Sequence, residues 1–84
     1  MHINLSYSVT KKVQSSILEI EIIGNMEGKN QYRITDFNDR LMMYGHFEGK
    51  LKKTCLYVGS LPPGEYFFQI DQNNKEAFFV LDVL

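Results

Sequence analysis

The chain of 84 residues has only one cysteine and two prolines, no tryptophan and no long apolar run. The single cysteine, Cys55, excludes an intrachain disulfide and leaves the redox compartment open. No stretch of roughly 18 apolar residues occurs, so the sequence predicts no membrane span. The start, from Met1 to Asn4, lacks the basic and apolar regions of a signal peptide. We therefore expect that any export signal lies outside this chain.

The sequence also has no excess of positive or negative charge. Nine Lys and Arg residues stand against ten Asp and Glu residues, which gives a net charge of −1 and a pI of about 6.1. Nucleic-acid-binding domains usually have a pI above about 9, so no nucleic-acid partner is expected. A hydrophobic content of 44% and a charged content of 23% are typical of a globular protein. This length suffices for one domain, residues 1–84, around one core.

Groups that could catalyse a reaction or hold a metal are few. His2 and His46 have no partner at metal-ligand spacing, whereas a zinc site needs three or four ligands. Cys55 lies on a predicted strand without a neighbouring histidine, which predicts a buried, inert thiol. The sequence contains no nucleophile elbow, phosphate loop or catalytic dyad. It therefore predicts a protein that is not an enzyme and has no cofactor or metal.

What the sequence does contain is alternation of apolar and polar residues with a period of two, the pattern of half-buried strands. Turn-forming clusters interrupt the alternation at intervals of about 8 to 12 residues, as in an all-β sandwich. We predict seven strands, at residues 3–9, 18–22, 32–37, 40–47, 54–58, 65–71 and 76–83. Residues 10–16 are predicted either as a loop that joins two strands or as a short extension of one of these strands. The last strand is the most apolar, which indicates that it lies inside a sheet or is covered by another chain.

The most informative segment joins a rigid turn to an alternating strand. After Leu61, Pro62 and Pro63 restrict φ and cannot donate to a ladder, and Gly64 can take a positive φ. Tyr66 is then the first inward residue of the strand. In immunoglobulin-like sandwiches, a tyrosine near such a corner sends its hydroxyl back to upstream backbone. The sequence therefore predicts an all-β fold, a single seven-stranded antiparallel immunoglobulin-like β-sandwich, with a structural corner at Leu61, Pro63, Gly64 and Tyr66.

The order of these motifs also resembles a known family. The run from Tyr32 to Met42, then Gly45, then the run from Val58 to Ile70 looks like the C-terminal sorting domains of type IX secretion cargo in Bacteroidota. Those domains read as a strand ending in Asp, a turn, a second strand, and Leu-x-x-Gly-x-Tyr. The resemblance implies a module at the end of a larger exported protein, recognised by export machinery and placed outside the cell or at its surface.

The chain departs from that family in three places. The usual Pro-Asn-Pro start is missing, Asn38-Asp39 replaces the usual glycine turn, and the end from Val80 to Leu84 has no lysine. The Leu-x-x-Gly-x-Tyr element also occurs in fibronectin type III and other immunoglobulin-like modules. The alternative hypothesis is therefore a stand-alone or modular binding domain that contacts protein or glycan.

A binding surface is predicted at the aromatics Tyr44, Tyr57 and Phe67, provided that they share a face. A contiguous exposed apolar patch usually marks a contact surface. A homodimer through an edge strand, with the apolar last strand as the candidate, is compatible with both hypotheses.

Overall fold

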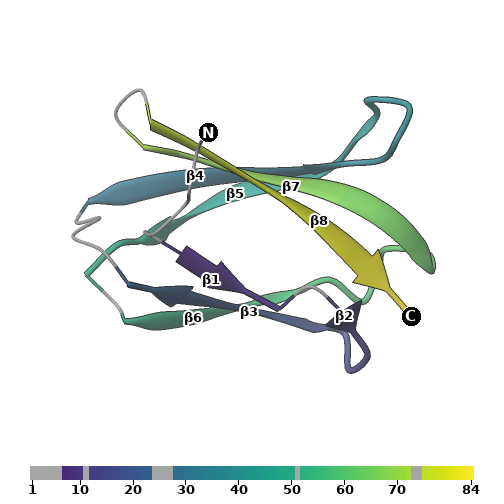
Figure 1. Ribbon diagram of the computed structural model, residues 1–84, viewed down its shortest axis with the longest axis horizontal. Coiled ribbons are helices and arrows are strands. Elements are labelled where there is room, and N and C mark those ends of the chain that lie inside the picture. Colours follow the sequence, from purple (N-terminus) through teal and green to yellow (C-terminus); the bar gives the residue numbers. More distant parts are fainter. Residues whose placement is uncertain (1–6, 11, 24–27, 51, 73–74) are drawn as a thin grey trace.

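The computed structural model describes residues 7–10, 12–23, 28–50, 52–72 and 75–84, and this part of the chain is all-β (Figure 1). No helix that could cross a membrane occurs in it. Its eight strands are β1 (Tyr7–Val9), β2 (Lys12–Val13), β3 (Ile17–Ile22), β4 (Lys29–Thr35), β5 (Leu41–Glu48), β6 (Lys53–Tyr57), β7 (Gly64–Gln72) and β8 (Lys75–Val83).

The strands form two sheets that lie one above the other in Figure 1. The smaller sheet has the order β1-β3-β6, and the larger has the order β2-β8-β7-β4-β5. The pairings are antiparallel except that of β2 with β8, which is parallel. The prediction of an all-β chain is confirmed, and the two-layered arrangement is compatible with a β-sandwich.

The strand count and one pairing differ from the prediction near the N-terminus. The expected strand at residues 3–9 is represented by β1, and residues 3–6 lie outside the described part. The additional strand, β2, pairs with Asp82 and Val83 of the last strand. It forms where Val13 is buried and its carbonyl accepts a hydrogen bond from the Leu84 amide at 3.0 Å. Two residues are too few to show alternation, so the sequence pattern could not reveal this strand.

The core lies between the sheets because the alternation turns one side of nearly every strand inward. Its buried apolar residues are Tyr7, Val9, Val13, Leu18, Ile20, Ile22, Ile34, Phe47, Val58, Leu61, Tyr66, Phe68, Ile70, Ala77, Leu81 and Val83. Phe68 is fully buried, with the rings of Tyr32 and Phe79 at centroid distances of 5.9 and 6.2 Å.

The corner before β7 is held by a buried tyrosine. The Tyr66 hydroxyl donates a hydrogen bond to the Pro62 carbonyl at 2.6 Å, and the Tyr66 ring is buried. Leu61 is buried as well, whereas Pro63 is exposed. Gly64 has a φ of 151°, a conformation that residues with a side chain rarely adopt. The turn thus delivers the chain into β7 with Tyr66 already facing the core.

A polar contact crosses the core from β1 to β4. The buried Tyr7 hydroxyl donates a short hydrogen bond to the side-chain oxygen of Asn30, and the Asn30 amide donates to the Gly28 carbonyl at 3.2 Å. Asn30 is fully buried, so these bonds offset the cost of removing its amide from water. Burial raises the pKa of Tyr7 to about 12, and the nearby charge of Asp71 adds to the shift.

The raised pKa of Tyr7 predicts that the folded protein loses stability at alkaline pH. Because folding raises the Tyr7 pKa from 10.0 to about 12, its contribution to stability is present below pH 10 and is lost as the pH rises toward 12. We expect Tyr7→Phe to flatten the fall in unfolding free energy over this window by about 1 to 2 kcal/mol. Urea denaturation at several pH values measures it, with Tyr44→Phe as the exposed control. Equal slopes in wild type and Tyr7→Phe would contradict the assignment.

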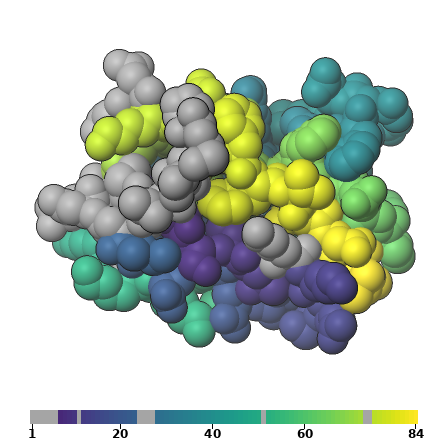
Figure 2. All heavy atoms as spheres, in the orientation of Figure 1, coloured from purple at the N-terminus to yellow at the C-terminus, as the bar shows by residue number. Residues whose placement is uncertain are grey.

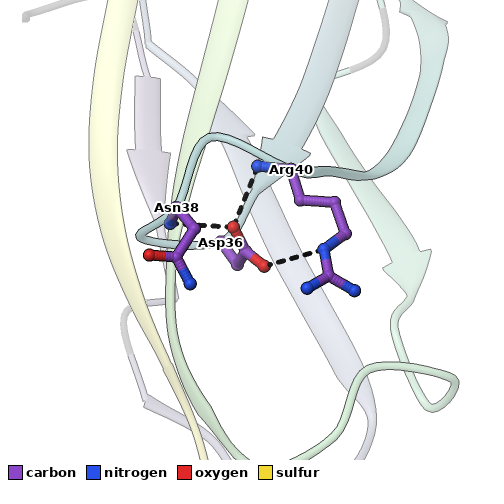
Figure 3. Close-up of polar contacts among 3 residues, drawn as sticks. All are labelled: Asp36, Asn38 and Arg40. Carbon is purple, nitrogen blue, oxygen red and sulfur yellow. Dashed lines mark hydrogen bonds and ion pairs between the residues drawn. The ribbon is translucent and has the colours of Figure 1, made fainter.

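The hairpin between β4 and β5 is organised by one carboxylate (Figure 3). Asp36 Oδ1 accepts hydrogen bonds from the backbone amides of Asn38 and Arg40, both at 2.9 Å. Its Oδ2 lies 3.5 Å from Nε of Arg40. Asp39 has a φ of 62°, so an aspartate takes the left-handed conformation that glycine usually supplies. Asp36 and Asp39 therefore have structural roles in the five-residue connection between Thr35 and Leu41.

Two substitutions at Asp36 separate these contacts. Asp36→Ala removes the acceptor for two backbone amides and is expected to lower the unfolding free energy by about 1 kcal/mol. Asp36→Asn keeps a side-chain oxygen and is expected to lose under about 0.5 kcal/mol, because the exposed ion pair with Arg40 contributes little. Chemical denaturation of both variants measures the difference. An equal loss in the two would instead assign the stabilisation to the ion pair.

Candidate functional site

The two sheets present different faces to solvent. The outward side of the small sheet is largely polar, with Glu19, Glu21 and Lys53 beside Cys55 and Tyr57. Lys53 Nζ lies 3.0 Å from a Glu19 carboxylate oxygen, and this hydrogen bond raises the pKa of the lysine. Such exposed pairs contribute little to stability. This face therefore combines charged side chains with the exposed neighbours Ile17 and Tyr57.

The outward side of the large sheet, here called the outer face, carries the exposed aromatic side chains. The strand register sets its residues in three rows across β8, β7, β4 and β5. The central row is Phe78, Gln69, Arg33 and Tyr44; the second is Val80, Phe67, Thr35 and Leu41; the third is Glu76, Asp71, Gln31 and His46.

Large apolar side chains stand in solvent on this face. Tyr44 is 77% exposed and Phe78 is 63% exposed, with Val80 and Leu41 at about half. In Figure 2 the atoms of β8, in yellow, reach the surface of the molecule. Phe37, in the hairpin after β4, stacks on Phe67 with ring centroids 4.5 Å apart and planes 11° from parallel. The hairpin thereby extends the aromatic surface beyond the sheet.

A polar ladder runs through the middle of the outer face. Arg33 donates from Nε and Nη2 to the Gln69 side-chain oxygen at 3.1 and 2.8 Å. The Gln69 amide in turn donates to Asp71 at 2.8 Å. Gln69 is 9% exposed although it points outward, since it lies between Arg33 and Phe78 on the neighbouring strands. The ladder holds the arginine against the sheet and places its charge near a carboxylate.

Two shallow depressions lie on either side of Arg33. One, of about 340 Å³, is bordered by Phe67, Gln69 and Phe78. The other, of about 370 Å³, is bordered by Tyr44, His46 and Asp71. Both are open to solvent, unlike the concave pockets that enclose small molecules. The shape therefore suits a broad, flat contact better than a small ligand.

The predicted binding aromatics do not all share a face. Tyr44 and Phe67 both lie on the outer face, from β5 and β7. Tyr57 lies on β6 of the small sheet and is 68% exposed there, so it does not share the outer face with Tyr44 and Phe67. Alternation within one strand shows that a residue points outward, but it does not show to which sheet the strand belongs.

Several residues of the outer face were missed by the sequence analysis: Phe37, Leu41, Phe78 and Val80. One signal was present, namely the high apolar content of the last strand. β8 lies between β2 and β7, and β2 pairs with its last residues, Asp82 and Val83. Its apolar residues alternate between the core, with Leu81, and the outer face, with Phe78 and Val80. Exposure of Phe78 and Val80 on the outer face accounts for part of the apolar content of this strand.

The potentially reactive side chains are dispersed. Cys55 was predicted to be buried and is exposed, because it occupies an outward position of β6. His46 lies at the β5 end of the third row, whereas His2 is outside the described residues. Within the described ranges, no three His, Cys, Asp or Glu side chains gather where they could hold a metal ion.

The functional inference for this chain rests on the geometry of the outer face. No protein-family model matches the chain, and no curated protein matches it significantly.

Proposed function

We propose that this chain is a non-catalytic interaction module that binds a protein partner through the outer face. The observation that carries the proposal is the exposed aromatic and aliphatic surface around Arg33, which spans four strands of one sheet. Protein interfaces are enriched in aromatic residues and arginine at their centre, and charged residues lie at the rim. Here Glu65, Glu76 and Asp82 border the apolar rows.

A protein partner suits this face better than a glycan. Sugars present many hydroxyls and need free donors and acceptors beside an aromatic ring. The side-chain oxygen and amide of Gln69 already bond to Arg33 and Asp71. Phe78, Val80 and Leu41 instead offer apolar area that becomes favourable when it leaves water.

The supporting fold assignment is an immunoglobulin-like sandwich. In that fold a strand order A-B-E faces a sheet containing G, F and C, and a tyrosine corner precedes or begins strand F. The orders β1-β3-β6 and β8-β7-β4-β5 correspond to this arrangement, with β7 as strand F. The hydrogen bond from Tyr66 to Pro62 supports the same correspondence.

The binding proposal is tested by affinity purification with matched variants. The wild-type domain, Phe78→Glu and Tyr44→Ser would be immobilised and exposed to extracts of the organism that encodes the chain. Tyr57→Ser serves as the control, because it removes an exposed tyrosine from the opposite face. A partner retained by wild type and Tyr57→Ser should bind the outer-face variants at least about 10-fold more weakly in a purified titration. Equal retention by all variants would contradict the proposal, and binding to a glycan array that these variants abolish would assign a glycan ligand instead.

A sorting domain is the second candidate. The two segments that resemble the type IX sorting family are neighbours in the structure, since β4 pairs with β7 from Gln31 to Thr35. The Asp36 hairpin and the Tyr66 corner complete that unit. Residues 1–84 would be fused behind a signal peptide and a reporter in a bacterium with a type IX system. Reporter outside the cell, lost on deletion of the system, would support sorting; reporter retained in the periplasm would exclude it.

A further inference from the structure

The rows of the outer face are arranged so that the face complements itself. The central row begins and ends on an exposed aromatic, Phe78 and Tyr44, and has Gln69 and Arg33 between them. A two-fold axis parallel to the strands, lying in the interface between β7 and β4, sets Phe78 of one copy on Tyr44 of the other. The same axis sets Gln69 on Arg33. We infer that the partner of the outer face is a second copy of this chain, an inference that rests on the proposed function.

The flanking rows match under the same operation. In the second row, Val80 of one copy meets Leu41 of the other and Phe67 meets Thr35, so this row is apolar apart from the Thr35 hydroxyl. In the third row, Glu76 meets His46, which places a carboxylate on an imidazole. Each contact occurs twice in an isologous dimer. All three rows are therefore compatible with one symmetry axis, which is a stronger condition than the presence of an apolar patch.

The other in-plane axis, perpendicular to the strands, produces mismatches. It sets Arg33 of one copy on Arg33 of the other, and like charges in contact oppose association. It also exchanges the second and third rows, so that Val80 meets Glu76. The register thus selects an axis parallel to the strands, within the roughly 30° rotation usual for aligned sheet packing.

The area of the outer face sets the expected affinity of the dimer. The four strands lie about 4.8 Å apart, and the three rows together cover about 20 Å along the strands. The contact area is therefore roughly 400 Å² per copy. A stable interface buries about 800 Å² per partner. The dimer should therefore be weak, with a Kd in the micromolar to millimolar range, and concentration decides whether it forms.

Sedimentation velocity over a concentration series measures the association. We expect wild type to pass from monomer to dimer between about 10 μM and 1 mM. Phe78→Glu should raise the dimer Kd by about 30-fold or more, since it puts a charge on the aromatic contact. Tyr57→Ser should leave the Kd within about 2-fold, because Tyr57 lies on the opposite face. Circular dichroism confirms that each variant is folded.

Cysteine pairing tests the axis itself. In a Cys55→Ser background, Tyr44→Cys and Phe78→Cys chains would be mixed and oxidised. The axis parallel to the strands predicts mixed disulfides between the two variants in preference to either variant pairing with itself. Preferential self-pairing of each variant would overturn this geometry.

The outcomes separate this inference from the proposed function. A monomer at every concentration, or a dimer indifferent to Phe78→Glu, overturns the inference. If such a monomer still loses a protein partner through Phe78→Glu, the proposed function stands with a different occupant. If it neither dimerises nor binds through the outer face, both are overturned.

Discussion

Phe68→Ala is expected to lower the free energy of unfolding by about 3 to 5 kcal/mol, the largest single effect predicted here. Phe68 is fully buried between the sheets, and the rings of Tyr32 and Phe79 pack beside it. Its removal leaves a cavity that these side chains cannot fill without leaving their own positions. A domain of this length has a total stability of roughly 4 to 13 kcal/mol, so the substitution removes about a quarter of it or more. Thermal and urea denaturation measure the loss.

Phe78→Ala is the matched control, because it deletes the same ring from the other side of the same sheet. Phe78 is 63% exposed, and we expect a change under about 1 kcal/mol in unfolding free energy. The two variants together separate a core phenylalanine from a surface one. A loss at Phe78 as large as that at Phe68 would contradict its assignment to a contact surface and make it a structural residue.

Gly45→Val is expected to cost about 2 to 3 kcal/mol through overpacking. Gly45 pairs with Tyr32 across the β4–β5 ladder, and the tyrosine ring covers it. A Cβ at this position would lie 2.8 Å from the Tyr32 hydroxyl oxygen and 2.9 Å from a ring carbon. The ring cannot move freely, because it packs against Phe47 and Phe68. Close approach of a side chain therefore explains a glycine in the middle of a strand.

A double-mutant cycle checks this cause. In a Tyr32→Leu background the obstructing ring is absent, so Gly45→Val should lose under about 1 kcal/mol relative to that background. Urea denaturation of the four chains supplies the coupling energy. If the loss is the same in both backgrounds, the glycine is required for its backbone conformation and the packing explanation is wrong.

The local features of the fold were accessible from sequence because they depend on neighbouring residues. Alternation from Ile17 to Ile22 and from Tyr66 to Ile70 predicted strands that the structure contains. The Tyr66 corner was predicted from Pro62, Pro63 and Gly64, and the hydrogen bond from Tyr66 to Pro62 is present there. Strand β2 was missed because its two residues take their conformation from pairing with Asp82 and Val83 at the far end of the chain.

The residues of the outer face could not be predicted from any single segment, because the face depends on which sheet each strand joins. Tyr44 and Tyr57 look alike in sequence, as exposed tyrosines on polar-apolar strands. They lie on opposite faces because β5 joins the large sheet and β6 joins the small one. Phe37 stacks on Phe67 although the two residues are thirty positions apart in the sequence. They meet because β4, which precedes the hairpin, pairs with β7.

By itself, the sequence of this protein determined where the strands other than β2 lie, where the chain turns, and which side chains alternate between two environments. These properties follow from backbone sterics and from the period of two, and both act over a few residues. Only the tertiary structure decided which strands are neighbours and in what register. That choice places Arg33, Gln69, Phe78 and Tyr44 in one row, because pairing between distant segments is governed by burial of the whole core.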